Sequence, residues 1–135
     1  MELRNETFHL LRHLFQQHTA RWQQALQDLT KPQYAVIRAV AENPGIEQVL
    51  LTEVAVSTKA TLAEMLSRME KRGLVRRESD PHDKRRRFVY LTAQGKALLE
   101  SSWPKGNAVD DAFLGQLSAA ERAEFTRLIR KMIDE

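Results

Sequence analysis

The sequence has no cysteine among its 135 residues, and this absence removes several kinds of chemistry together. Without thiols the chain has no disulfide, no thiolate metal ligand and no thiol nucleophile, a composition that suits a reducing compartment. It has no apolar run long enough to cross a membrane, and the residues after Met1 show no secretory pattern. We therefore expect a cytoplasmic protein that makes no membrane contact.

The sequence also lacks the patterns that identify common active sites. It has no glycine-rich phosphate loop, no serine in a nucleophile elbow and no pair of carboxylates with an evident pocket. We expect no enzymatic activity and no cofactor. Because 42% of the residues are hydrophobic, the chain has enough apolar material for one core, and we expect a single domain over residues 1–135.

Positive charge is concentrated in one part of the sequence. Residues 58–90 contain ten lysines and arginines against five acidic residues, whereas the rest of the chain carries a net charge of −2. A basic segment on a nearly neutral body is typical of a protein that binds a polyanion such as DNA. A solvated charged surface would give the same composition, so charge alone does not decide between the two.

Apolar periodicity predicts helices at both ends of the chain. Residues 3–29 form a stripe with spacings of three and four, which predicts one long helix. Thr30 then caps a second helix that has Pro32 in its first turn, and an Asn-Pro-Gly sequence ends that helix. At the other end, Ser118 and Glu121 form a capping box for the last helix.

The middle of the chain predicts a helix-turn-helix followed by a two-stranded hairpin. A third helix over residues 46–54 precedes a fourth, which ends at Gly73. Residues 74–77 and 87–91 are short strands joined by a polar turn, and residues 103–107 break or kink the helix that follows. The fold class is mainly α with a small β-hairpin wing, that is, a winged helix-turn-helix. The apolar face of the fourth helix carries Leu62, Met65, Leu66 and Met69.

The fourth helix is the element expected in the major groove. Because its apolar face turns toward the core, the opposite face meets the bases. Thr61 offers a hydroxyl and a methyl group, and Glu64 accepts from a cytosine amino group. Hydroxyls at the helix N-terminus suit phosphates. The contacts expected from this element are Ser57, Thr58, Lys59, Ala60, Thr61, Glu64 and Arg68, and ordinary helix surface explains each of them equally well.

The hairpin turn carries four consecutive cations, residues 84–87, which repel one another unless an anion compensates. Arginine suits insertion into a narrow, negative minor groove. Asp83 precedes Arg85 by two residues, a spacing at which the carboxylate holds the guanidinium in one orientation. We expect Lys84, Arg85 and Arg86 to contact DNA, with Asp83 orienting Arg85.

The chain resembles the MarR family of winged helix-turn-helix regulators, and the resemblance is carried by residues 74–77, 80–85, 89–92 with Gly95, and 29–34. It implies a homodimer that binds a pseudo-palindromic operator in double-stranded DNA and usually represses transcription. It also implies that Arg85 enters the minor groove. Many relatives carry a basic residue in the place of Glu64, so the base preference at that position is not carried over.

Both ends of the chain give a reason for dimerisation. The apolar stripes of residues 3–29 and 125–133 are too long for a chain of this size to bury within one subunit. Pairing two copies would cover them and hold two recognition helices about 34 Å apart on the duplex. We expect a DNA-binding lobe at residues 30–92 and dimerisation helices at 1–29 and 93–135. The alternative is that both end helices pack on one core.

The family resemblance also implies a small aromatic effector, phenolic or carboxylated. His18 interrupts an apolar stripe beside Trp22, and Arg21 flanks it. An imidazole among aromatic rings with a nearby guanidinium suits a carboxylated ring, and Tyr34 supplies a hydroxyl. We expect the effector at these four residues. A histidine satisfied by a backbone carbonyl is the alternative for His18.

Two further hypotheses are weaker. His9 and His13 have the i, i+4 spacing of a zinc-binding pair, but they point away from the apolar stripe and lack an evident third ligand, so we expect no metal. The rival function is a winged-helix adaptor that binds another protein without specific DNA binding. Steep salt dependence of DNA binding would separate the two functions.

Overall fold

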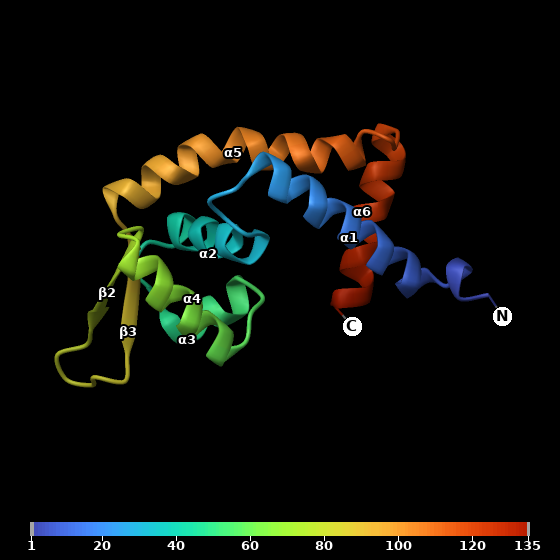
Figure 1. Cartoon of the computed structure of the whole chain (residues 1–135). Coiled ribbons are helices and arrows are strands. Elements are labelled where there is room, and N and C mark those ends of the chain that lie inside the picture. Colours follow the sequence, from blue (N-terminus) through green and yellow to red (C-terminus); the bar gives the residue numbers. More distant parts are fainter. Residues whose placement is uncertain (1, 135) are drawn as a thin grey trace. The chain divides into compact units, whose positions relative to one another are not determined.

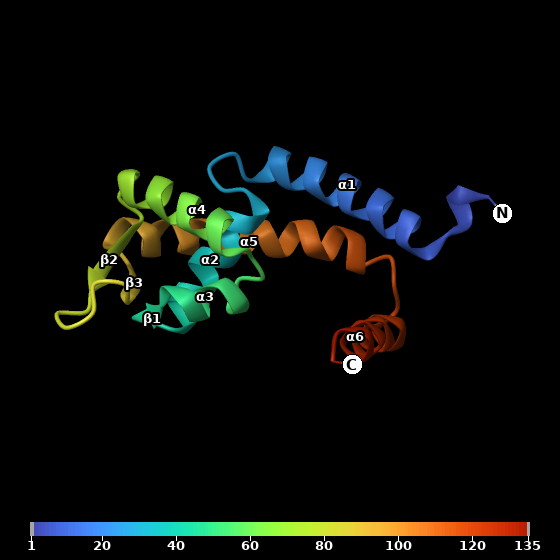
Figure 2. The same cartoon turned by 90° about the horizontal axis from the view of Figure 1, so that it is seen from below.

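The computed structural model describes residues 2–134 and divides them into two compact units (Figures 1 and 2). The central unit spans Leu26–Pro104, and the terminal unit combines the segment up to Ala25 with the segment from Lys105 onward. The expected fold class is confirmed, because the chain is mainly helical with one small antiparallel sheet. The helices are α1 (Thr7–Ala25), α2 (Lys31–Glu42), α3 (Gln48–Val54), α4 (Lys59–Lys71), α5 (Ala93–Leu114) and α6 (Ala119–Ile133), after a short 3-10 turn at Leu3–Asn5.

The core of the central unit lies among α2, α3, α4 and the sheet. Each of these elements contributes side chains with essentially no exposed surface, and the spacing of three and four in α2 and α4 places them on one face. Burial of this apolar surface is the main stabilising contribution to the unit. The fully buried members include Val36, Ile37, Leu51, Leu62, Leu66, Met69 and Val89.

The sheet has the strand order β1-β3-β2, with β1 at Ile46–Glu47, β2 at Val75–Ser79 and β3 at Arg87–Leu91. Strand β3 is central: its residue Phe88 pairs with Glu47 on one side and with Glu78 on the other. Figure 2 shows β1 beside α3 and the β2–β3 hairpin extending beyond it. The hairpin is therefore attached to the start of α3 as well as to the end of α4.

Local signals in the sequence place several helix ends correctly. Thr30 and Gln33 form a reciprocal capping box at the start of α2, and Pro32 lies in its first turn. Ser118 and Glu121 do the same for α6. Gly73 has a φ of +76°, the left-handed conformation expected after α4.

The terminal unit contains few buried side chains. Within the described residues, Trp22 is the buried member of α1, and α6 has none. Large apolar side chains on both helices are instead exposed, among them Phe8, Phe15, Leu128, Met132 and Ile133. No helix in residues 2–134 has the length and apolar character needed to cross a membrane.

Two expected helices begin or end elsewhere. The helix over residues 3–29 is wrong at both ends: Glu6 is extended, and α1 ends at Ala25. Leu29 is buried in the segment that leads to Thr30, whose capping geometry requires an extended backbone. The third helix was expected over residues 46–54, but its first two residues form β1 because they pair with β3.

Two other expectations need correction. Residues 103–107 do not break the helix, since α5 continues through Pro104 to Leu114. Proline has a helical φ, so it fits in α5 at the cost of one helix hydrogen bond, and the expected kink stays a prediction. The first hairpin strand was expected at residues 74–77 but spans Val75–Ser79, since pairing extends to Ser79 opposite Arg87.

Candidate DNA interface

Helix α4 presents one polar face to solvent. Leu62, Leu66 and Met69 are fully buried, and this fixes the rotation of the helix about its axis. Glu64 and Arg68, one turn apart, are both exposed and form an ion pair of 2.7 Å between Oε1 and Nη2. The exposed side chains on this face therefore include those expected from the sequence, namely Lys59, Ala60, Thr61, Glu64 and Arg68.

The N-terminus of α4 is capped by a hydroxyl. Thr58 Oγ1 accepts a hydrogen bond of 3.2 Å from the backbone N–H of Thr61. Ser57 Oγ donates to the carbonyl oxygen of Thr58 at 3.3 Å. Both hydroxyls thus have local hydrogen-bond partners, while Lys59 is exposed at the first position of the helix.

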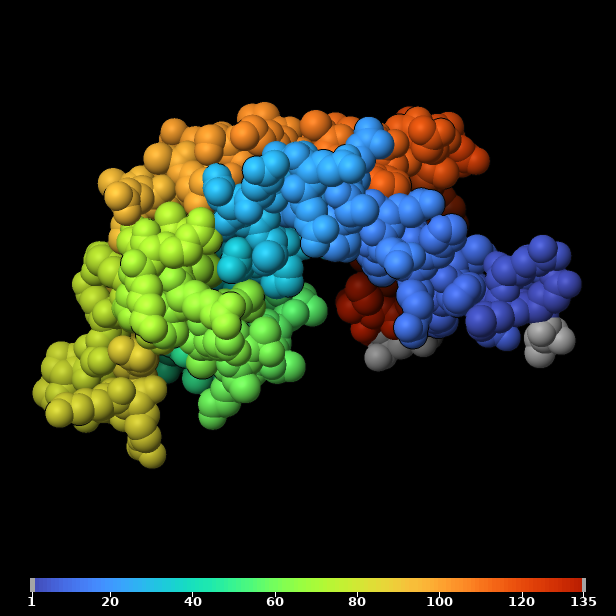
Figure 3. Space-filling view, in the orientation of Figure 1, coloured from blue at the N-terminus to red at the C-terminus, as the bar shows by residue number. Residues whose placement is uncertain are grey.

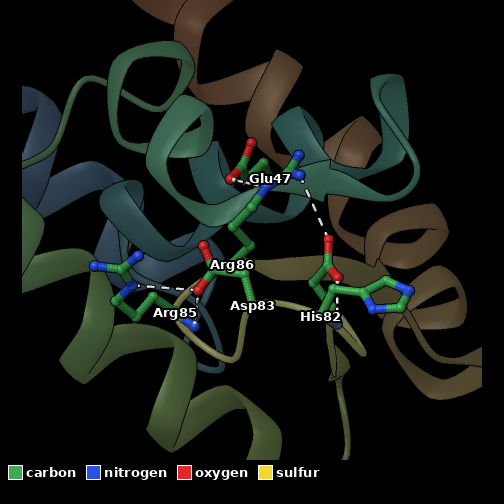
Figure 4. Close-up of polar contacts among 6 residues, drawn as sticks. Glu47, His82, Asp83, Arg85 and Arg86 are labelled. Atoms are coloured by element: carbon green, nitrogen blue, oxygen red, sulfur yellow. Dashed lines mark hydrogen bonds and ion pairs between the residues drawn. The ribbon is translucent and has the colours of Figure 1, made fainter.

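At the tip of the β2–β3 hairpin, Asp83 holds Arg85. Asp83 Oδ1 accepts from the Arg85 backbone N–H at 3.0 Å and from Arg85 Nε at 3.2 Å (Figure 4). The Arg85 side chain is 92% exposed, so its guanidinium is oriented without being covered. In the space-filling view this hairpin, in yellow, projects from the rest of the central unit (Figure 3). The pairing of Asp83 with Arg85 has the form expected from the sequence.

The neighbouring arginine points the other way. Arg86 Nε donates to Glu47 Oε1 at 3.0 Å, and Arg86 Nη1 donates to Asp80 Oδ2 at 3.4 Å. Figure 4 shows the Arg86 side chain directed toward Glu47, on the opposite side of the loop from Arg85. The hydrogen bond that Arg86 donates to the Glu47 carboxylate raises the pKa of Arg86, which stays charged. Arg86 was grouped with Lys84 and Arg85 as a DNA contact, but its guanidinium has two carboxylate partners within the protein.

A second arginine connects the hairpin to both helices of the motif. The Arg77 side chain is 9% exposed and donates to both carboxylate oxygens of Glu70 on α4, at 3.0 and 3.4 Å. It also donates to Gln48 Oε1 on α3 at 3.4 Å. The hydrogen bond from Arg77 lowers the pKa of the Glu70 carboxyl group. Helix α4 and strand β2 are thereby held in one arrangement.

Three of the expected effector residues lie in the terminal unit. His18 Nε2 is 2.7 Å from Asp110 Oδ1. Its ring stacks on Trp22, with centroids 6.1 Å apart, and lies at an angle to Phe113 at 5.4 Å. Arg21 is exposed on the same helix. His18 therefore has a carboxylate partner and two aromatic neighbours.

Tyr34, the fourth expected effector residue, belongs to the central unit. It is buried on α2, and the guanidinium of Arg38 lies 5.9 Å from the centre of its ring. Arg38 also stacks on Trp103 at 4.2 Å. As for metals, no cluster of three potential ligands occurs within residues 2–134, and His13 is hydrogen-bonded to Gln17 at 3.3 Å.

Comparison with known proteins identifies the family. A family model described as the MarR family matches residues 29–86. The transcriptional regulator HosA of Escherichia coli is 67% identical over 134 residues, which cover 99% of each chain. The chain belongs to the MarR family. It is a transcriptional regulator that binds DNA.

Two further MarR-type relatives have more specific descriptions. The transcriptional repressor NicR of Pseudomonas putida is 36% identical over 128 residues, covering 93% of this chain and 81% of NicR. A solved structure of BpsR from Bordetella bronchiseptica superposes with a TM-score of 0.93 at 31% identity, covering 100% of this chain and 98% of that one. That structure is described as showing how 6-hydroxynicotinic acid regulates DNA binding by BpsR.

The sequence did not reveal several carboxylates that form hydrogen bonds with the candidate site residues. Glu47 and Asp80 hold Arg86, and Asp110 binds His18. Glu47 and Asp110 lie 39 and 92 residues from their partners, so no local motif reveals these pairs. The run of four cations at residues 84–87 is a sequence signal of such partners, because adjacent like charges repel unless an anion compensates.

Proposed function

We propose that this MarR-family regulator is a homodimeric repressor that binds a pseudo-palindromic operator and is released by a small aromatic phenol or carboxylate. The observation that carries the DNA-binding part is the presentation of Arg85 at the hairpin tip. Its guanidinium is fully accessible yet already oriented by Asp83, so little conformational entropy is lost when it meets DNA.

In the proposed complex, the exposed face of α4 and the hairpin tip contact different grooves of the DNA. Helix α4 enters the major groove, where Ala60, Thr61 and Glu64 face the bases. Before Glu64 can accept from a cytosine amino group, its ion pair with Arg68 opens, and Arg68 turns to a phosphate. Arg85 enters the minor groove beside it. The remaining contacts, to phosphates, come from Ser57, Thr58, Lys59 and Lys84.

Operator binding by an Arg85→Ala variant tests this assignment. Loss of a charge-assisted contact should weaken binding by about 1.5–3 kcal/mol. Lys96→Ala is the matched control, because Lys96 is an exposed cation of the central unit on α5, outside α4 and the hairpin. Fluorescence anisotropy over a salt series measures both. Equal, small losses of operator affinity for the two variants would show that the hairpin does not contribute a specific contact to DNA.

The terminal unit supports the proposal of a dimer. Its helices expose Phe8, Phe15, Met132 and Ile133, and α6 buries no side chain. Isolated helices with an uncovered apolar stripe are marginally stable in water. A second copy covers these stripes and provides the second recognition helix that a pseudo-palindromic operator requires.

The effector proposal rests on the ring cluster around His18. Trp22 and Phe113 supply aromatic surface, and the imidazole binds a carboxylate already, that of Asp110. A carboxylated aromatic effector takes the place of Asp110 at His18 Nε2, with the exposed Arg21 on the same helix as a cation for its carboxylate. The description of BpsR, whose DNA binding 6-hydroxynicotinic acid regulates, supports an effector of this class. The repressor function of NicR supports the direction of regulation.

A further inference from the structure

The junction between β1 and α3 contacts the hairpin through two consecutive side chains. Glu47 Oε1 accepts from Arg86 at the hairpin tip, and Gln48 Oε1 accepts from Arg77 in β2. Glu47 is the N-cap residue of α3, yet its side chain makes no capping hydrogen bond to that helix. Its carboxylate is directed to the hairpin instead of to its own helix.

A continuous chain of contacts leads from Glu47 to Arg85. The backbone N–H of Arg86 donates to the carbonyl oxygen of Asp83 at 3.0 Å, and the backbone N–H of Asp80 donates to the carbonyl oxygen of Arg86 at 3.0 Å. Arg86 thus ties both sides of the tip loop together. Asp83, which Arg86 holds from the backbone side, is the residue whose carboxylate orients Arg85.

We propose that Glu47 is a positioning residue for DNA recognition: through Arg86 it fixes the hairpin tip in the conformation that presents Arg85 to the minor groove. The inference rests on the proposed contact between Arg85 and DNA. It also assigns Arg86 to the internal anchor and leaves Lys84 and Arg85 as the cations that face DNA.

The electrostatics of the site make this role distinguishable from a simple charge effect. Glu47 and Asp80 are both mostly shielded, with side chains 23% and 18% exposed, and together they surround one guanidinium. A carboxylate near a DNA-binding surface repels phosphates, so removing it should strengthen DNA binding if nothing else changes. A positioning role predicts the opposite sign for specific binding, because a loosened tip raises the ordering cost of Arg85.

The test is a double-mutant cycle on the full-length protein, with binding measured to an operator duplex and to a duplex of scrambled sequence. Glu47→Gln should weaken operator binding while leaving scrambled-sequence binding unchanged or stronger. In the wild-type background Arg85→Ala should weaken operator binding at least about tenfold. In the Glu47→Gln background the same change should cost less than about threefold, because the two residues act through one contact.

Glu53→Gln is the matched control. It removes the same charge from α3, and in the described part of the chain the Glu53 carboxylate makes no hydrogen bond or ion pair. This variant should bind operator as tightly as the wild type or more tightly. It should also leave the full Arg85→Ala loss in place.

The outcomes separate the inference from the function on which it rests. If Arg85→Ala has no effect in the wild type, the proposed DNA contact fails. If Arg85→Ala retains its full effect in the Glu47→Gln background, the contact stands and the positioning role of Glu47 is overturned. Should Glu47→Gln fold poorly, judged by thermal unfolding, Glu47→Asp replaces it: the shorter side chain keeps the charge but reaches Arg86 less well, and the same cycle decides.

Discussion

Val56 and Gly73 occupy the same position in the two helix ends of the DNA-binding motif. Each residue lies just after a helix and has a positive φ, 54° for Val56 and 76° for Gly73. At each, the residue after it donates its backbone N–H to a carbonyl five residues back, from Ser57 to Thr52 and from Leu74 to Met69. Both ends are Schellman motifs, in which glycine is the usual left-handed residue. A β-branched residue there is strained, and Val56 is also 90% exposed.

Val56→Gly should therefore stabilise the protein, although an exposed valine to glycine change normally has little or the opposite effect. Relief of the left-handed strain exceeds the extra entropy that glycine gains in the unfolded chain, for a net increase of about 0.5–1 kcal/mol in the free energy of unfolding. Val54→Gly, at the last residue of α3, where φ is not positive, is the control and should not stabilise the protein. Urea unfolding measures both, and a loss of stability in Val56→Gly would contradict the strain argument.

Gly95→Ala should destabilise the protein, against the usual trend for alanine in a helix. A Cβ at this position would lie 2.1 Å from the carbonyl oxygen of Leu74, a backbone atom at the start of the hairpin. Helix α5 and the hairpin would have to separate, at about 1–3 kcal/mol. A lowered midpoint in thermal unfolding, with weaker operator binding, is the expected result. An unchanged or higher midpoint would show that the two segments move apart freely.

Stability should fall in acid partly through Glu70. Its folded pKa is lowered by the Arg77 hydrogen bond, so its stabilising contribution is fully present above its ordinary pKa of 4.5 and is lost as pH falls through the lowered value. Glu70→Gln should be less stable than wild type at pH 7, and the difference should shrink as the pH falls below 4.5 through the lowered pKa. Glu64→Gln on the same helix, whose ion pair is exposed, should differ little from wild type at any pH. A pH-independent difference for Glu70→Gln would exclude this mechanism.

Phe8→Asp should produce monomers. The side chain is 77% exposed on α1, and a charge within a covered apolar stripe is costly to bury. Operator affinity should fall with the dimer, because two half-sites are then no longer bound together. Val49→Asp introduces the same charge at an exposed apolar residue of the central unit and should remain dimeric. Sedimentation equilibrium measures both, and equal behaviour of the two variants would count against the dimer interface.

His18→Phe should bind operator normally and no longer respond to effector. The phenyl ring keeps the aromatic packing against Trp22 and Phe113 but cannot bind a carboxylate. Release of a labelled operator by a panel of phenolic and carboxylated aromatic compounds is the assay, and His13→Phe, at an exposed position of the same helix, is the control. If His18→Phe instead loses the fold, His18 is a structural residue held by Asp110.

Sequence patterns predicted the features of this fold that are determined locally. The capping residues Thr30 and Ser118 mark helix starts because their hydroxyls reach N–H groups three residues away. Asp83 and Arg85 could be paired because they are only two residues apart in the sequence. The class of fold followed from the order of such elements, and the family from the resemblance carried by the motifs at residues 29–34 and 74–95.

Features that depend on distant partners were not predictable from the sequence. The strand at Ile46–Glu47 exists because β3 pairs with it, and its two residues are too few to show a period. Pro104 indicates a helix break by local rules, but α5 continues through it. Val56 gives no sequence signal of a left-handed residue, because that signal is a glycine or asparagine.

The two neighbouring arginines of the hairpin tip also differ in whether they would keep their partners if the loop were grafted onto another protein. Arg85 is oriented by a residue two positions away, so a grafted loop carries that orientation with it into another winged-helix scaffold. Arg86 depends on Glu47, 39 residues earlier, and a graft of the loop alone leaves it without that partner. With the proposed positioning role of Glu47, an exchange of DNA specificity between relatives would require transfer of the start of α3 together with the hairpin.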